Sequence, residues 1–191
     1  MHAPAGSPDL GFRFAGMPPT GALPASIDFG LHRKDEPARF DAVLFTDLQP
    51  ESLNEVGYIR DDVVSMVDAS HAAFGITHCD IMFDDLSYYP RYNRIVGTFG
   101  LPWFNCRGNH DMNLEAPDNT HAAETFKRVF GARWHAFRHG GATFILLDNV
   151  DYLGTDPSKP NGFGKYRGFS ATASWVSSAT CWRTSRPTAW W

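Results

Sequence analysis

Short apolar runs alternate with segments of helical period through the middle of this chain. Ala42–Phe45 is a continuous apolar run that ends just before Asp47, as expected of a strand buried on both faces. In the segment that follows, apolar residues from Val56 to Val67 recur at helical spacing. Alternation of this kind predicts an α/β fold in which helices are layered on a sheet.

The same patterns place the remaining elements. We expect strands at about 42–46, 75–79, 102–106, 134–138 and 143–148 in a single sheet, and helices at about 52–72, 84–99 and 120–130. The segment Gly162–Gly168 resembles a phosphate-binding glycine loop only loosely, because its spacing is one residue too long. We therefore expect it to be an ordinary loop.

Composition limits the classes of function. The 191 residues are 43% hydrophobic, which suits one globular domain with a buried core. A formal net charge of −4 gives no basic surface for a nucleic-acid backbone. No apolar run approaches the roughly 20 residues that a membrane-spanning helix needs. Three cysteines without CxxC spacing argue against a disulfide framework and against a thiolate zinc site.

Polar side chains gather just past the carboxyl ends of three predicted strands. They are Asp47 and Gln49 after the first strand, Asp80 after the second, and Asn109, His110 and Asp111 after the third. In open α/β sheets this edge is where binding sites form. Oxygen and imidazole donors suit hard or borderline divalent cations. A carboxylate shared between two cations holds them close enough to act together on a phosphate ester.

Each of these residues also has a purely structural interpretation. Asp47 could cap the following helix, Asp80 and Asn109 could occupy tight turns, and His110 could be an ordinary buried histidine. The functional interpretation is favoured by the order of the motifs, each after its own strand. A Gly-Asn-His-Asp sequence alone arises by chance in about one of a thousand chains of this size.

Three motifs of this chain resemble those of the calcineurin-like metallophosphoesterases. The family motifs run Asp-x-His, Gly-Asp-x-x-Asp and Gly-Asn-His-Asp/Glu. Their counterparts here are Asp47-x-Gln49, Cys79-Asp80 with Asp84, and Gly108–Asp111. Bacterial members with Asp-x-Gln in the first motif are the most similar, and the resemblance covers roughly residues 38–173. It implies an incomplete four-layer β-sandwich flanked by helices.

The resemblance implies a metal-dependent hydrolase of phosphate mono- or diesters that acts on a small phosphorylated substrate. Two divalent cations, of Mn, Fe, Zn or Mg, would be its cofactors. By the same resemblance, Asp47 and Gln49 hold the first metal, Asp80 bridges both and Asn109 holds the second. Gln49 departs from the family's usual histidine and offers a neutral amide oxygen instead. Cys79 replaces a glycine, so its side chain crowds the backbone before Asp80.

The resemblance also implies the catalytic groups. His110 would face the phosphate and either stabilise its charge or protonate the leaving oxygen, and Asp111 would orient His110. Three further family ligands, all histidines, have no counterpart because no histidine follows His139. We therefore expect the chain as written to be essentially inactive. A non-catalytic remnant and an α/β interaction module stay open as alternatives.

The two ends of the chain differ in character from the rest. Residues 1–37 are rich in Pro, Gly and Ala, which predicts an arm or linker. This segment also resembles the remnant of an upstream β domain. Residues 174–191 show no period and scatter four tryptophans among Ser, Thr and Arg. A neighbouring reading frame permits an amphipathic helix there, so we expect an out-of-frame tail; a disordered polar tail is the alternative.

Overall fold

The computed structural model describes residues 4–6, 18–28, 30, 36–156, 158 and 164–168. The tail predicted at 174–191 and most of the arm predicted at 1–37 lie outside these residues. Helices and strands are mixed along the described part of the chain, so the α/β class is confirmed at that level.

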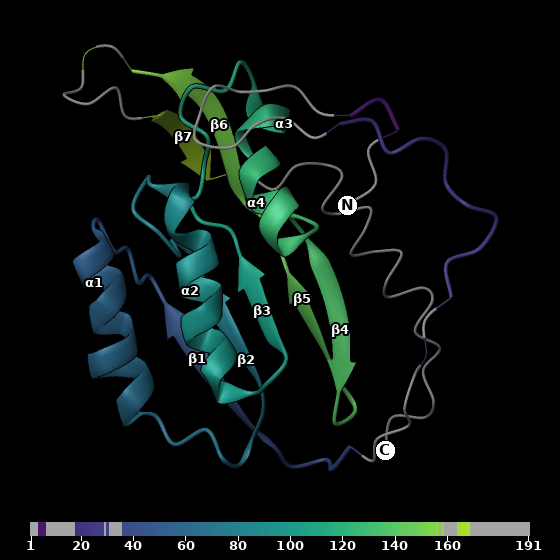
Figure 1. The fold of residues 1–191 in the computed structure, drawn as a ribbon, viewed down its shortest axis with the longest axis vertical. Coiled ribbons are helices and arrows are strands. Elements are labelled where there is room, and N and C mark those ends of the chain that lie inside the picture. The colour runs from purple at the N-terminus through teal and green to yellow at the C-terminus, as the bar shows by residue number, and fades with distance from the viewer. Residues whose placement is uncertain are drawn as a thin grey trace.

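A parallel sheet forms the centre of the fold (Figure 1). Its strands are β1 (Asp41–Thr46), β2 (Ala72–His78) and β3 (Trp103–Cys106), in the order β1-β2-β3. In the register, His78 at the end of β2 pairs with Thr46 of β1 and Cys106 of β3. The three strands therefore end together, and the loops that follow them start from one edge of the sheet.

The first helical segment is shorter and less regular than the helix predicted at 52–72. It consists of α1 (Leu53–Tyr58), a π-helical turn (Ile59–Val63) and a 3₁₀ turn (Val64–Met66). The Ser52 hydroxyl caps the start by accepting a hydrogen bond from the Glu55 backbone N–H. Helical geometry ends at Val67, where the backbone becomes extended and leads into β2.

The second helix lies close to its predicted place. A 3₁₀ turn (Leu86–Tyr88) leads into α2 (Tyr89–Val96), and a second 3₁₀ turn (Gly97–Phe99) ends at Gly100. Gly100 adopts the left-handed conformation, with φ 67°, that terminates many helices. Phe45 of β1, Val56 of α1 and Tyr92 of α2 belong to one buried cluster, so both helices pack on the same face of the sheet (Figure 1).

The next two strands form a hairpin of their own. β4 (His135–His139) and β5 (Ala142–Leu146) pair antiparallel, and the prediction that they share the sheet of β1–β3 is wrong. Gly140 and Gly141 connect them with φ of 56° and 83°, as a tight hairpin turn requires. Stacked aromatic rings join the hairpin to the sheet, with the centroids of Phe104 and Phe137 3.7 Å apart.

Two short helices and a second hairpin complete the described chain. The helix predicted at 120–130 is confirmed as α3 (Asn119–Ala122) followed by α4 (Glu124–Phe130). β6 (Val150–Thr155) pairs antiparallel with β7 (Gly164–Gly168). The loop predicted at Gly162–Gly168 is therefore wrong for its last five residues. In the described part of the chain, no helix has the length and apolar character needed to cross a membrane.

Gly75 of β2 offers a test of this packing. A Cβ atom at Gly75 would lie 2.1 Å from the indole ring of Trp103. That ring is fixed because its Nε1 donates to Thr77 Oγ1 at 2.9 Å. We expect Gly75→Ala to lower the free energy of unfolding by about 1–3 kcal/mol, measured by urea denaturation.

The matched control is Gly97→Ala. A Cβ there meets no atom within 4 Å, and the backbone is helical. This control should change the free energy of unfolding by less than about 1 kcal/mol. Equal losses in the two variants would contradict the close contact between Gly75 and Trp103.

Candidate functional site

The loops after β1 and β2 hold an unusual concentration of backbone strain. Among the described residues, the non-glycine positions with positive φ are Asp47 (57°), Gln49 (44°), Cys79 (65°), Asp80 (29°) and Asp84 (59°). All five belong to the first two motifs singled out in the sequence. Such conformations cost about 1–3 kcal/mol each and cluster at functional sites, where the surrounding structure enforces them.

Backbone hydrogen bonds join the three loops at the sheet edge. Asp47 N–H donates to the carbonyl of His78 at 3.3 Å, and Gln49 N–H donates to the carbonyl of Asp80 at 3.1 Å. From the third loop, His110 N–H donates to Asp80 Oδ1 at 2.9 Å. Gly108 lies so close that an added Cβ would be 1.9 Å from Asp80 Oδ1. Glycine is thus required at this position of the third motif.

The side chains of the first two motifs converge on one another. Gln49 Nε2 donates to Asp47 Oδ1 and to Asp80 Oδ2, each at 3.0 Å. These two carboxylate oxygens therefore lie within about 6 Å of each other. The positively polarised amide group sits between them, in the place where a cation would balance both charges. A half-turn of the amide would present the Gln49 oxygen instead.

Asn109 follows Gly108 and precedes the residue whose N–H binds Asp80. Its side chain is half-buried and has no hydrogen-bond partner among the described residues. The predicted ligands Asp47, Gln49 and Asp80 are thus brought together, and Asn109 lies beside them on the third loop.

His110 is held by Asp84 and Phe83. Its Nδ1 lies 2.9 Å from Asp84 Oδ1, and its ring stacks on Phe83 with centroids 4.3 Å apart. Burial lowers the pKa of His110, but the hydrogen bond to Asp84 and the charges of Asp84 and Asp80 outweigh it, so the pKa is raised overall. Because Nδ1 faces Asp84, Nε2 is the ring nitrogen left for another partner.

Asp111 is completely buried and binds other groups than His110. Its carboxylate accepts hydrogen bonds from the backbone N–H groups of Ile81, Met82 and Gly108 and from the Tyr89 hydroxyl, at 2.8–3.2 Å. Burial raises the pKa of Asp111 to about 6, against the lowering effect of the hydrogen bonds from Gly108, Ile81 and Tyr89. The resemblance made Asp111 the residue that orients His110, whereas in the structure the carboxylate in contact with the His110 ring is that of Asp84.

The donor chemistry fits a hard divalent cation only in part. Asp47 and Asp80 offer carboxylate oxygens, and Gln49 and Asn109 offer amide oxygens, as Mg²⁺ or Mn²⁺ prefers. In the part of the chain that the structure describes, no three His, Cys, Asp or Glu side chains come together as a metal site. These four residues are the ones that would hold such an ion, and they are fewer than the three or four protein ligands that each of two ions normally takes.

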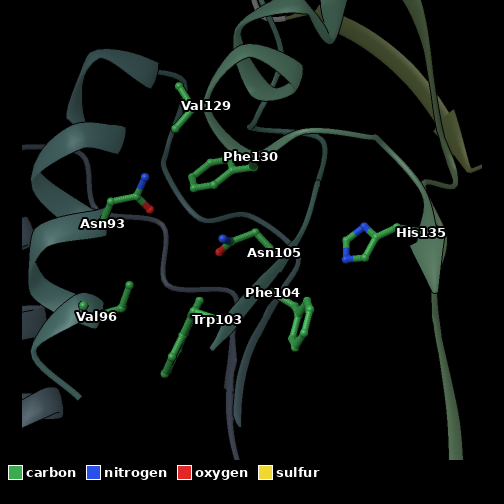
Figure 2. Close-up of a pocket in the computed structure, with 9 residues that line it drawn as sticks. Asn93, Val96, Trp103, Phe104, Asn105, Val129, Phe130 and His135 are labelled. Atoms are coloured by element: carbon green, nitrogen blue, oxygen red, sulfur yellow. The ribbon is translucent and has the colours of Figure 1, made fainter. Parts of the chain in front are cut away.

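Two of the cavities in the described part of the chain lie against the sheet close to the ends of β2 and β3. The first, with a volume of about 270 Å³, lies between α2, β3, α4 and the start of β4. Its lining includes Trp103, Phe130 and His135 (Figure 2). It contains none of the motif residues. A second cavity, of about 540 Å³, reaches the end of β2 and β3 and includes Cys79 and Cys106 in its wall. The loops after β1, β2 and β3, rather than either cavity, carry the polar groups predicted from sequence.

Comparison of the chain with protein-family models, curated proteins and solved structures found no match. The candidate site thus rests on its own geometry. Asp84 belongs to the second motif, but its contact with His110 was not predicted. Arg107 and Asp148, which form a buried ion pair, were not predicted either. The available signals were a charged residue directly after β3, at Arg107, and another at the end of the apolar run 144–147, at Asp148.

The Asp84–His110 contact can be tested in the metal-free protein. Asp84→Asn removes the negative charge that raises the pKa of His110, so we expect that pKa to fall. The measurement is an NMR titration of the His110 ring. Asp85→Asn, which changes a neighbouring carboxylate that accepts from Ser87, is the control and should leave the pKa in place. An unchanged pKa in Asp84→Asn would rule out the contact.

The role of Asp111 as a buried acceptor predicts a large loss of stability. Asp111→Asn replaces one acceptor oxygen with an NH₂ group that faces donors, and should lower the free energy of unfolding by about 3 kcal/mol. Tyr89→Phe removes one of the four hydrogen bonds and should cost about 1–2 kcal/mol. Urea denaturation measures both. A loss in Asp111→Asn no larger than in Tyr89→Phe would contradict this role.

Proposed function

We propose that the loops after β1, β2 and β3 form part of the two-metal centre of a calcineurin-like hydrolase of phosphate mono- or diesters. The observation that carries the proposal is the convergence of Asp47 and Asp80 on Gln49, with His110 bonded to Asp80. The strained backbone of the first two loops supports it, because strain of this kind is retained where a site requires it. The substrate would be a small phosphorylated molecule.

In this proposal Asp47 and Gln49 hold one cation, Asp80 is shared, and Asn109 belongs to the second cation. When bound, the two divalent ions, of Mn, Fe, Zn or Mg, would supply Lewis acidity and a hydroxide near neutral pH. The protein's own part is to fix these oxygens. Asp80 is 4% exposed and accepts hydrogen bonds from Gln49 and from the His110 backbone, so its carboxylate has one orientation.

His110 is the proposed group for charge stabilisation or proton donation. Asp84 raises the pKa of His110 and so favours the protonated ring, whose Nε2–H can donate to a phosphate oxygen or to the leaving oxygen. Phe83, stacked on the ring, restricts its rotation. His110 would therefore act on the substrate without serving as a metal ligand.

A non-catalytic chain is the second candidate. The observation that favours it is the shortage of ligands among the described residues, since metal sites normally use three or four protein ligands for each ion. In that case the same loops would bind a cation weakly or serve only as turns, and no phosphate ester would be hydrolysed.

Metal titration separates these candidates. Asp80→Asn should reduce Mn²⁺ affinity at least about tenfold, because it changes the shared ligand. His110→Ala should leave the affinity within about threefold of the wild type. Isothermal titration calorimetry of the 191-residue chain gives both values, with Asp62→Asn, an exposed carboxylate on the π-helical turn, as control. Equal losses in the Asp80 and His110 variants would refute the division of roles.

Turnover is a separate prediction. With added Mn²⁺, the chain as written should hydrolyse para-nitrophenyl phosphate or its diester far more slowly than about 1 s⁻¹, because its ligand shell is incomplete. A rate of that order or above would contradict this expectation. It would mean that the remaining ligands come from this chain or from a second subunit.

A further inference from the structure

Arg107 occupies a position that the proposed reaction does not use directly. It stands between Cys106, the last residue of β3, and Gly108, the first residue of the third motif. Its guanidinium is buried against Asp148, and both side chains are 0% exposed. Asp148 lies 41 residues further along the chain, between β5 and β6.

The contact between these two side chains is bidentate. Arg107 Nε donates to Asp148 Oδ2 at 3.0 Å, and Nη2 donates to Oδ1 at 3.1 Å and to the Val150 carbonyl at 2.9 Å. Asp148 also accepts from the Val150 N–H and from Arg133 Nε. Two parallel hydrogen bonds fix both the distance and the angle between the planar guanidinium and the carboxylate, which a single hydrogen bond does not.

Stability alone does not account for this pair. A buried ion pair loses the hydration of both charges, and well-packed apolar side chains in its place are often as stable or more stable. Arg107 Nη1 is in addition buried without a hydrogen-bond partner, which adds to the cost. What the pair provides is a defined position for the backbone at Arg107.

The backbone that follows Arg107 is in direct contact with the candidate site. Gly108, the next residue, packs against Asp80 with no room for a Cβ atom, and its N–H donates to Asp111. The His110 N–H then donates to Asp80 Oδ1. Any shift of the chain at Arg107 would therefore change the spacing between the third motif and Asp80.

We propose that Arg107, through its bidentate pair with Asp148, is a positioning residue that sets the hydrogen bond between His110 N–H and Asp80. It touches neither substrate nor metal. Its effect on metal binding rests on the proposed function, whereas its effect on the His110 amide does not. The two consequences can therefore be measured apart.

The experiment compares Arg107→Lys and Arg107→Met with Arg133→Lys in the 191-residue chain. Arg107→Lys keeps the positive charge but loses the bidentate hydrogen bonding of the guanidinium. In Arg107→Met the Asp148 carboxylate still accepts hydrogen bonds from Arg133 Nε and from the Val150 N–H. Arg133 binds the same carboxylate from the segment before β4, away from the third motif, so Arg133→Lys is the matched control. Urea denaturation gives each variant's stability for comparison.

Two readouts are taken. Amide hydrogen exchange in the metal-free protein reports the His110 N–H, and calorimetry reports Mn²⁺ affinity. We expect both Arg107 variants to raise the hydrogen-exchange rate of the His110 N–H about tenfold more than their loss of global stability accounts for. We also expect both to lower Mn²⁺ affinity about tenfold. Arg133→Lys should change each by less than about twofold.

His110 exchange that follows global stability alone in all three variants would overturn the proposal. Faster His110 exchange confined to the Arg107 variants would support it, even if the wild type binds no Mn²⁺. In that last case the proposed metal centre would fail while the positioning role stands.

Discussion

The buried carboxylate of Asp111 is the interaction on which the arrangement of the site depends. It accepts hydrogen bonds from the backbone of Ile81 and Met82 after β2 and of Gly108 after β3, and from the hydroxyl of Tyr89 on α2. Three separate segments are thus fixed to one point beneath the sheet edge. Because the carboxylate is wholly buried, water cannot reach it to replace a lost hydrogen bond. A donor that lost its bond to Asp111 would therefore remain buried and unsatisfied.

Above this point the parallel sheet determines which residues can meet. The common end of the three strands brings the loops side by side, and the strained turns then direct the side chains of Asp47, Gln49 and Asp80 toward one another. A parallel sheet needs long connections between its strands, and here they are filled by the helices that cover one face. The same parallel topology therefore places the helices over one face of the sheet, where they form the core, and the polar groups at the carboxyl edge of the strands, which the helices do not cover.

The sequence predicted the local features of this fold better than the long-range ones. The apolar run before Asp47 located β1 to within a residue, whereas the small residues Ala72 and Ala73 gave too weak a signal to mark the start of β2. Hydrophobic pattern does not specify pairing partners, so the separate β4–β5 hairpin was missed. The motifs identified the candidate ligands, but their contacts depend on tertiary packing. The link from His110 to Asp84 became visible only in the structure.

The Arg107–Asp148 pair also defines how much of the chain must be kept together. A shortened protein that ended after the third motif would contain every candidate ligand discussed above and would still leave the Arg107 guanidinium buried without its carboxylate. Uncompensated buried charge is strongly unfavourable, so such a piece would rearrange at the strand end that carries the motif. The smallest segment that could carry these loops into another scaffold therefore extends from β1 to Asp148 and includes the β4–β5 hairpin.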